Sequence, residues 1–225
     1  MENVYMNMNE NTIAVLKNFS TINPSLAFKQ GNILRTMAPN KAVLAKATLD
    51  ETIPSDFAIY ELHRFLGVVS LMKNPRYEIG ASSMTIHGDA RRKVKYVYAD
   101  TSTFVTPPDH DLNMPSIDVS FNLKTNQYQD IMKALGVMSL PELVITVEDG
   151  NLVLRGTDTS NPSSNDYDIV VGETDSKPFT AIIRTDHLKI VPNDYSVSIS
   201  SAGICRFESS AITYWVSVES KSTFS

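Results

Sequence analysis

Two stretches of the chain share one pattern, in which a short apolar strand runs directly into an amphipathic helix. In the first, residues 57–60 are followed from Leu62 by large apolar residues at the i, i+3, i+4, i+7 spacing of a helix with one buried face. The charged residues of that helix lie off its apolar stripe. The second stretch, residues 179–191, has the same design in a shorter form. The pattern therefore predicts two strand–helix units of one kind.

Two further helices and two tight turns are predicted by the same kind of pattern. One helix begins at Thr12 behind a cap at Asn11, and another spans residues 123–138. Apolar runs flank Gly31-Asn32 and Gly150-Asn151, which is typical of a β-hairpin. The remaining strands alternate apolar and polar residues, at 42–49, 77–79, 84–87, 94–98, 167–171, 195–199, 204–207 and 212–218.

The two halves of the chain follow one order of elements: helix, hairpin, strand, strand into helix, and meander. Gly31 and Gly150 are 119 residues apart, and Tyr77 and Tyr195 are 118 apart. This near-constant offset indicates an internal duplication. A segment with three prolines and no periodicity separates the halves. We therefore expect an α+β protein of two similar domains, each with antiparallel strands and two helices, at residues 1–104 and 117–225, with a connector at 105–116.

Composition places the chain among soluble globular proteins. Of its 225 residues 42% are hydrophobic, which is enough for two cores. Residues 1–11 are polar, unlike a signal sequence, and are expected to fray, and no apolar run approaches the ~18 residues of a membrane span. Cys205 is the sole cysteine, which excludes an intramolecular disulfide and suits a reducing cytoplasm. Its place in a strand pattern predicts a buried core residue.

Motifs for catalysis, cofactors and metals are missing from the sequence. It contains no phosphate-binding glycine loop and no nucleophile elbow, and its four histidines lack zinc-ligand spacing. Asp109-His110-Asp111 offers ligand atoms, but its proline-rich surroundings favour a solvated loop. Asp186-His187 is interpreted as the capped start of a helix. We therefore expect a protein that is not an enzyme and needs no cofactor or metal.

The formal net charge of −5 argues against a nucleic-acid partner, but a sum does not say where the cations lie. Each predicted helix has at least one cation off its apolar face, whereas acidic residues concentrate in hairpins and loops. A solvated helix face is the ordinary explanation. A second basic cluster, Arg91-Arg92-Lys93, is interpreted as an exposed turn, with phosphate contact as the alternative. The helix cations are Lys17, Arg64, Lys124, Lys133 and Lys189.

Three segments resemble one known family. They are residues 14–23 (AVLKNFSTIN), residues 58–71 with the Phe65-Leu66-Gly67 motif, and residues 214–223. In this order they resemble the DNA polymerase sliding clamp of T-even-type bacteriophages, and the likeness extends over nearly the whole chain.

The resemblance implies a fold, an assembly and a set of partners. It implies the DNA-clamp fold and a closed ring of three subunits around double-stranded DNA, bound without regard to sequence, with helices lining the hole and sheets forming the outer wall. It implies a DNA polymerase and an ATP-driven clamp loader as partners, together with late-transcription factors. The place of action would be the cytoplasm of the infected bacterial host.

The resemblance also assigns residues. Lys17, Lys124, Lys133 and Lys189 match positions where the family has basic residues that line the hole, whereas Arg64 is assigned there from helix geometry alone. The entry to the first helix, residues 9–11, is less basic than in relatives. The subunit interface would pair the strand holding Val94, Tyr96 and Tyr98 with the neighbour's strand holding Tyr167, Ile169 and Val171. The partner pocket would include Val105, Leu112 and Met114.

Two other classes of protein remain as alternatives. A duplicated, β-rich viral structural or assembly protein would use its sheet edges to build rings or tubes, and it would not need cations on its helices. A single-strand binder would need aromatic and basic residues interleaved on its strands, but most strand aromatics in this sequence alternate into the predicted core.

Overall fold

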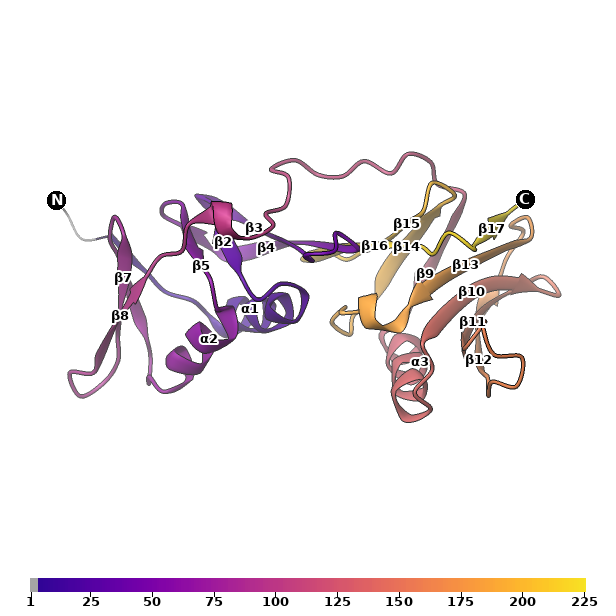
Figure 1. Ribbon diagram of the computed structural model, residues 1–225, viewed down its shortest axis with the longest axis horizontal. Helices are drawn as coiled ribbons and strands as arrows, with labels where there is room; N and C mark the ends of the chain where they lie inside the picture. The colour runs from indigo at the N-terminus through magenta and orange to yellow at the C-terminus, as the bar shows by residue number, and fades with distance from the viewer. Residues whose placement is uncertain (1–3) are drawn as a thin grey trace. The chain divides into compact units, whose positions relative to one another are not determined.

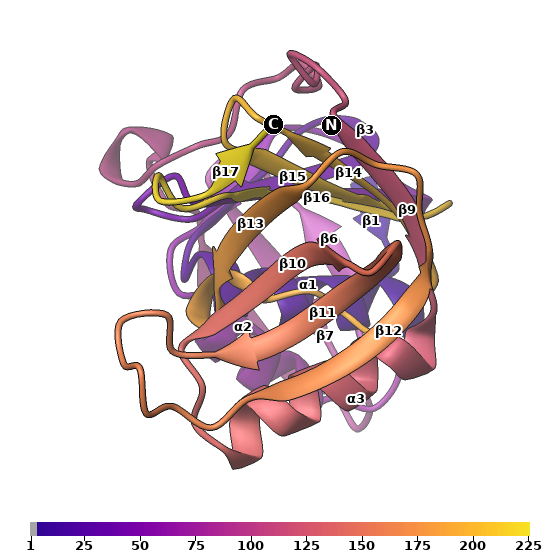
Figure 2. The same cartoon turned by 90° about the vertical axis from the view of Figure 1, so that its right-hand side faces the viewer.

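The computed structural model describes residues 4–225 of the chain. Its contacts divide the chain into two compact units, Met1–Asp109 and His110–Ser225. Figure 1 labels most of the helices and strands, and β1 and β6 are labelled in Figure 2. Every strand pairing described within the units is antiparallel. Because each unit also contains helix, its architecture is α+β.

The first unit contains a four-stranded sheet, two further strand pairs and two helices (Figure 1). The order in the sheet is β1 (Val4–Met6), β6 (Arg76–Ile79), β7 (Ser83–His87) and β8 (Lys93–Val97). The strand pairs are β2 (Leu26–Phe28) with β5 (Phe57–Ile59), and β3 (Gly31–Met37) with β4 (Val43–Ile53). The helices are α1 (Glu10–Ile22) and α2 (Leu62–Ser70), and a 3-10 turn, η1, spans Thr101–Thr103.

The second unit contains a five-stranded sheet and a run of four paired strands. The order in the sheet is β12 (Tyr167–Glu173), β11 (Asn151–Thr157), β10 (Glu142–Glu148), β13 (Phe179–Arg184) and β17 (Thr223–Phe224). The four-strand run is β16 (Ile212–Ser217), β15 (Ile204–Glu208), β14 (Tyr195–Ser200) and β9 (Val119–Leu123). Figure 2 shows α3 (Thr125–Val137) running along β12, and η2 (Thr185–His187) is a single 3-10 turn.

Phe65 lies at the centre of the first core. It is fully buried on α2, and its ring centroid is 6.2 Å from that of Tyr77 on β6 and 5.4 Å from that of Tyr96 on β8. The predicted apolar stripe of this helix is buried at Leu62, Phe65 and Leu66. The sequence pattern therefore predicted correctly where α2 lies in the sequence and which of its faces is buried.

The second core repeats this arrangement around Tyr195, the counterpart of Tyr77. The ring of Tyr195 lies 6.4 Å from that of Tyr128 on α3 and 6.1 Å from that of Phe207 on β15, with near-perpendicular planes. Gly156 on β11 allows α3 to approach closely, because a Cβ there would lie 2.9 Å from Leu135. Cys205 is fully buried in this unit, as predicted.

One of the two predicted hairpins differs from the sequence prediction. The hairpin around Gly150 forms between β10 and β11 as expected. The apolar runs on either side of Gly31 do not form a hairpin with each other, because β2 pairs with β5 and β3 with β4. Gly31 has a φ of 117° and turns the chain from one strand pair to the other. The local sequence predicted the turn but could not identify the partner strands, which are distant in sequence.

The predicted fourth helix is also wrong, because only the turn η2 forms there. Ile190 and Val191 are β-branched and Pro192 follows them, which disfavours helix in the remaining residues. Asp186 does not cap this turn with its side chain; it pairs with Arg184, with Nε and Oδ1 3.0 Å apart.

The ends of the other helices are shifted by a few residues. Asn9 rather than Asn11 caps α1, accepting a hydrogen bond from the Thr12 N–H at 2.8 Å. Leu123 belongs to β9 rather than to α3. Residues 4–6 form β1 and pair with β6, so the expectation of fraying is wrong for them, and residues 1–3 lie outside the described residues.

Candidate nucleic-acid interface

Lys17 and Lys133 are the most available of the predicted helix cations. Lys17 lies on α1 and Lys133 on α3, and both side chains are exposed. Within residues 4–225, neither ammonium group forms an ion pair with an acidic side chain. On each helix the opposite face is buried, so the fold itself holds these lysines toward solvent. Such side chains can approach a phosphate without first breaking an internal contact.

Arg64 and Lys124 are exposed but already engaged. Arg64 at the start of α2 pairs with Glu61, with Nη1 and Oε2 2.9 Å apart. Lys124 precedes α3 and pairs with Asp194, with Nζ and Oδ2 3.3 Å apart. Exposed pairs of this kind contribute roughly 0–1 kcal/mol. A phosphate could therefore replace either carboxylate at small cost.

Lys189 differs most from its sequence prediction. It follows the turn η2 instead of lying on a helix, and it is half-buried. Its N–H donates to the carbonyl oxygen of His187 at 2.9 Å. The prediction that Lys189 lies on a fourth helix is therefore wrong, because only the turn η2 forms there.

A groove beside Lys17 was not predicted from the sequence. It has a volume of about 1020 Å³ and lies where α1 meets the C-terminal end of α2. Ile13, Val69 and Met72 give it apolar walls, while Lys17 and Arg76 supply cations. Arg76 begins β6 directly after a proline, and nothing in a local pattern connects it with α1. The structure thus adds a second cation beside Lys17.

The two strands predicted at the subunit interface are both at sheet edges. Within the part of the chain that the structure describes, β8 pairs with β7 and β12 with β11, each on one side only. The predicted residues on both strands, Ile169 among them, are half-buried except Tyr167, which is 36% exposed. Val94 is one of the half-buried residues, and Tyr96 and Tyr98 pack on the rings of Phe65 and Phe57 within their own unit. On these two strands the most exposed apolar side chains are instead Val97 and Val170, which are 66% and 60% exposed.

The predicted pocket residues are divided between the two units. Val105 is half-buried, and its carbonyl oxygen accepts a hydrogen bond from Asn23 Nδ2 at 3.2 Å. Leu112 and Met114 belong to the second unit and are half-buried there. A cavity of about 130 Å³ lies beside the start of the connector in the first unit, and Pro107 rather than Val105 lines it.

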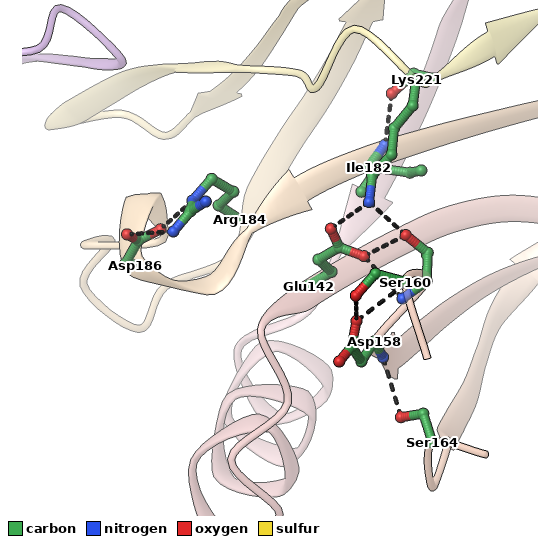
Figure 3. A network of polar contacts seen from close by, with 10 residues as sticks. Glu142, Asp158, Ser160, Ser164, Ile182, Arg184, Asp186 and Lys221 are labelled. Atoms are coloured by element: carbon green, nitrogen blue, oxygen red, sulfur yellow. Dashed lines mark hydrogen bonds and ion pairs between the residues drawn. The ribbon is translucent and has the colours of Figure 1, made fainter. Parts of the chain in front are cut away.

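A polar network in the second unit holds the C-terminal segment in place (Figure 3). Lys221 Nζ lies 2.6 Å from Glu142 Oε1, and Thr159 donates to the other carboxylate oxygen at 2.6 Å. Burial of Glu142 opposes its ionisation, but the hydrogen bonds from Lys221 and Thr159 outweigh this and lower its pKa. Ser222 accepts a hydrogen bond from the Ile182 N–H at 2.9 Å. The network fastens the segment that leads into β17 onto β10 and β13.

Asp194 secures the start of α3 and makes the stability of this helix depend on pH. It accepts hydrogen bonds from the N–H and the hydroxyl of Thr125 at 2.8 and 2.9 Å, and these bonds, with Lys124, lower its pKa. A lowered folded-state pKa stabilises the fold above the unfolded value of about 3.9, and this contribution is lost as pH falls through the folded value. We expect Asp194→Asn to be less stable than the wild type near neutral pH, with the difference in unfolding free energy narrowing as pH falls below about 3.9 and through the lowered folded-state pKa. Denaturant midpoints of both proteins across this range test it, and a gap that persists in acid would contradict it.

Other kinds of site find no support in the described residues. Among residues 4–225, no three His, Cys, Asp or Glu side chains gather in a way that could hold a metal ion. No helix in this range is both long and apolar enough to cross a membrane.

Comparisons with known proteins cover both units. The family model described as DNA polymerase processivity factor matches residues 8–105, and the one described as gp45 sliding clamp, C terminal, matches residues 120–220. The sliding clamp of Vibrio phage KVP40 is 32% identical over 220 residues, which is 95% of this chain and 99% of that protein. The sliding clamp of Escherichia phage RB69 is 31% identical over 230 residues, covering 97% and 99%. The PCNA of A. fulgidus, solved with the C-terminal region of FEN-1 bound, superposes with a TM-score of 0.71 at 11% identity, covering 99% of this chain and 100% of that one.

Proposed function

The chain belongs to the family of phage sliding clamps, which are DNA polymerase processivity factors, and we propose on this premise that three copies of it close into a ring around duplex DNA. The observation that carries the proposal is the match over both units, in order, across 95% of the chain. The ring would tether the replicative DNA polymerase to its template. In this role the protein acts mechanically, by holding two partners together, and catalyses no reaction of its own.

The exposed helix lysines suit a contact that must slide. Lys17 and Lys133 present single charges on long, flexible stems, which attract phosphates without reading bases. Arg64 and Lys124 can join them by exchanging their exposed carboxylate partners for phosphate. The net charge of −5 per chain disfavours DNA elsewhere on the surface. The closed ring then retains the protein on the DNA, and contacts to phosphates that do not read bases allow it to slide.

A closed ring needs help to reach DNA that has no free end. We therefore assign the chain an ATP-dependent clamp loader as a partner, late-transcription factors as further partners, and the cytoplasm of the infected bacterium as its place of action. The region around the connector, with Val105, Leu112 and Met114, is the proposed site for partner peptides. The A. fulgidus PCNA solved with the C-terminal region of FEN-1 supports peptide binding on this fold.

Mass in solution and polymerase run length test the proposal together. We expect a discrete species of three times 24.9 kDa, and longer products from a primed circular template only when loader and ATP are both supplied. Sedimentation equilibrium and a primer-extension assay measure the two quantities. Large polymers without an effect on synthesis would favour a viral assembly protein instead, and a stable monomer would contradict the ring.

A further inference from the structure

Helix α2 packs on one face of the four-stranded sheet in the first unit and leaves the far face open. Its Phe65 contacts the rings of Tyr77 on β6 and Tyr96 on β8. Successive side chains of a strand point to opposite faces, so Glu78 and Lys95 lie on the far face. Along β6, β7 and β8, every residue of the far face is exposed or half-buried. This face therefore has no helix packed on it through these contacts and is open to a partner.

The register of the four strands places an exposed aromatic ring and two lysines on the far face. The row that begins with Tyr5 on β1 and Glu78 on β6 crosses β7 and ends at Lys95 on β8 (strands labelled in Figures 1 and 2). In the next row His87 lies opposite Lys93. The ring centroids of Tyr5 and His87 are 6.5 Å apart. We call the surface formed by Tyr5, His87, Lys93 and Lys95 the cationic sheet face.

The positive charge of the cationic sheet face is not neutralised locally. Lys93 and Lys95 are exposed, and within residues 4–225 neither forms an ion pair. Glu78 is already engaged, because its Oε2 lies 2.7 Å from Nε2 of His87. The hairpin between β7 and β8 adds two exposed arginines. The net charge of −5 disfavours DNA over most of the surface, but this face has a local excess of cations that attracts an anionic partner.

The exposed ring of Tyr5 distinguishes between anionic partners. This side chain is 55% exposed and lies among the cations. An acidic peptide would need the cations alone, whereas a single-stranded nucleic acid combines a charged backbone with bases that stack on aromatic rings. Duplex DNA keeps its bases inside the stack, where a surface ring does not reach them. The combination of ring and cations therefore fits a single strand best.

We propose that the cationic sheet face is a second nucleic-acid site, which binds single-stranded DNA without regard to sequence. Tyr5 stacks on a base, and Lys93 and Lys95 bind backbone phosphates. The row from Tyr5 to Lys95 crosses three strand spacings, about 14 Å, which is the length of about four stacked nucleotides. The site is separate from Lys17 and Arg64, because α2 lies on the opposite face of the sheet. It is complete within one unit, so it does not depend on the proposed ring.

Binding of a short single strand to the protein, without loader or ATP, tests this site. The probe is a labelled oligothymidylate of about twelve nucleotides, and fluorescence anisotropy measures its affinity. We expect Tyr5→Ala to raise Kd roughly five- to tenfold because a stacked base is lost, and Tyr5→Phe to keep Kd within roughly twofold. Lys93→Gln with Lys95→Gln should raise Kd and flatten the slope of log affinity against log salt by about 1.4, the value for two phosphate contacts.

Matched changes elsewhere on the chain provide the controls. Tyr60 is 56% exposed, so Tyr60→Ala removes an equally exposed ring that lies outside the cationic sheet face. Lys41→Gln with Lys177→Gln removes the same charge at two other exposed sites. Both control variants should bind the oligothymidylate as tightly as the wild type and with the same salt dependence.

Three results would overturn the proposal. A wild-type protein without measurable affinity for the oligothymidylate at low salt would remove the site. Equal weakening by Lys17→Gln with Lys133→Gln would place the strand on the helices instead. A Tyr5→Ala variant that binds as tightly as the wild type would show that no base stacks there, and displacement of the probe by polyglutamate would then assign the face to an acidic protein segment. Sedimentation tests the ring separately, so none of these results decides whether three copies assemble.

Discussion

Reversing the charges of Lys17 and Lys133 together is expected to abolish most of the clamp-dependent stimulation of DNA synthesis while leaving the ring assembled. Both side chains are exposed on helices and lack ion-pair partners among residues 4–225. Each change to Glu replaces attraction to phosphate by repulsion, and each phosphate contact accounts for nearly one power of the salt dependence of binding. We expect loading and processive synthesis to fall by at least roughly tenfold. Primer extension on a circular template, with loader and ATP present, measures the loss.

A matched variant tests whether the position of the two lysines matters or only the net charge of the protein. Lys41→Glu with Lys177→Glu changes the charge equally at two exposed sites outside the helices, and it should retain most of the stimulation. Sedimentation of both variants should show assembled rings. If the helix variant forms rings and still supports full synthesis, Lys17 and Lys133 do not face the DNA.

Truncating Phe65 is expected to cost the first unit about 3–5 kcal/mol of unfolding free energy. This side chain is fully buried and contacts the rings of both Tyr77 and Tyr96, so Phe65→Ala leaves a cavity shared by α2, β6 and β8. Total stabilities of about 5–15 kcal/mol make such a loss large enough to release α2 from the sheet. Native-state hydrogen exchange at the amides of these elements measures it in the full chain.

An exposed residue at the C-terminal end of α2 provides the control for this change. Leu71 follows α2 and is 70% exposed, so Leu71→Ala should shift stability by no more than about 0.5 kcal/mol. Because the two units need not unfold together, amides in β10 and β11 should exchange as in the wild type in both variants. A loss below about 1 kcal/mol in Phe65→Ala would show that α2 is held mainly by other contacts.

The candidate site could be predicted only in part from the sequence. The polar faces of α1 and α3 follow from helical periodicity, so Lys17 and Lys133 were found on exposed helix faces as the pattern implied. Arg76 was missed because only the folded chain brings the start of β6 to the groove that α1 and the end of α2 line beside Lys17. The ion pairs of Arg64 and Lys124 were also missed, although Glu61 lies only three residues from Arg64, since a pattern of charges does not say which of them meet.

Periodicity and turn chemistry act over a few residues. On that scale the sequence alone determined the strands, the buried face of α2 and the hairpin at Gly150. The constant offset between matching residues also showed the repetition of one unit in two halves. Tertiary structure decided which strands pair, because β2 and β5 are joined by contacts between residues about thirty positions apart. The replacement of the predicted fourth helix by the turn η2 follows instead from the local sequence, because Ile190 and Val191 are β-branched and Pro192 follows them. The stretch from Phe57 to Ser70 could be recognised locally, but its role required the packing of Phe65 against strands that follow later in the chain.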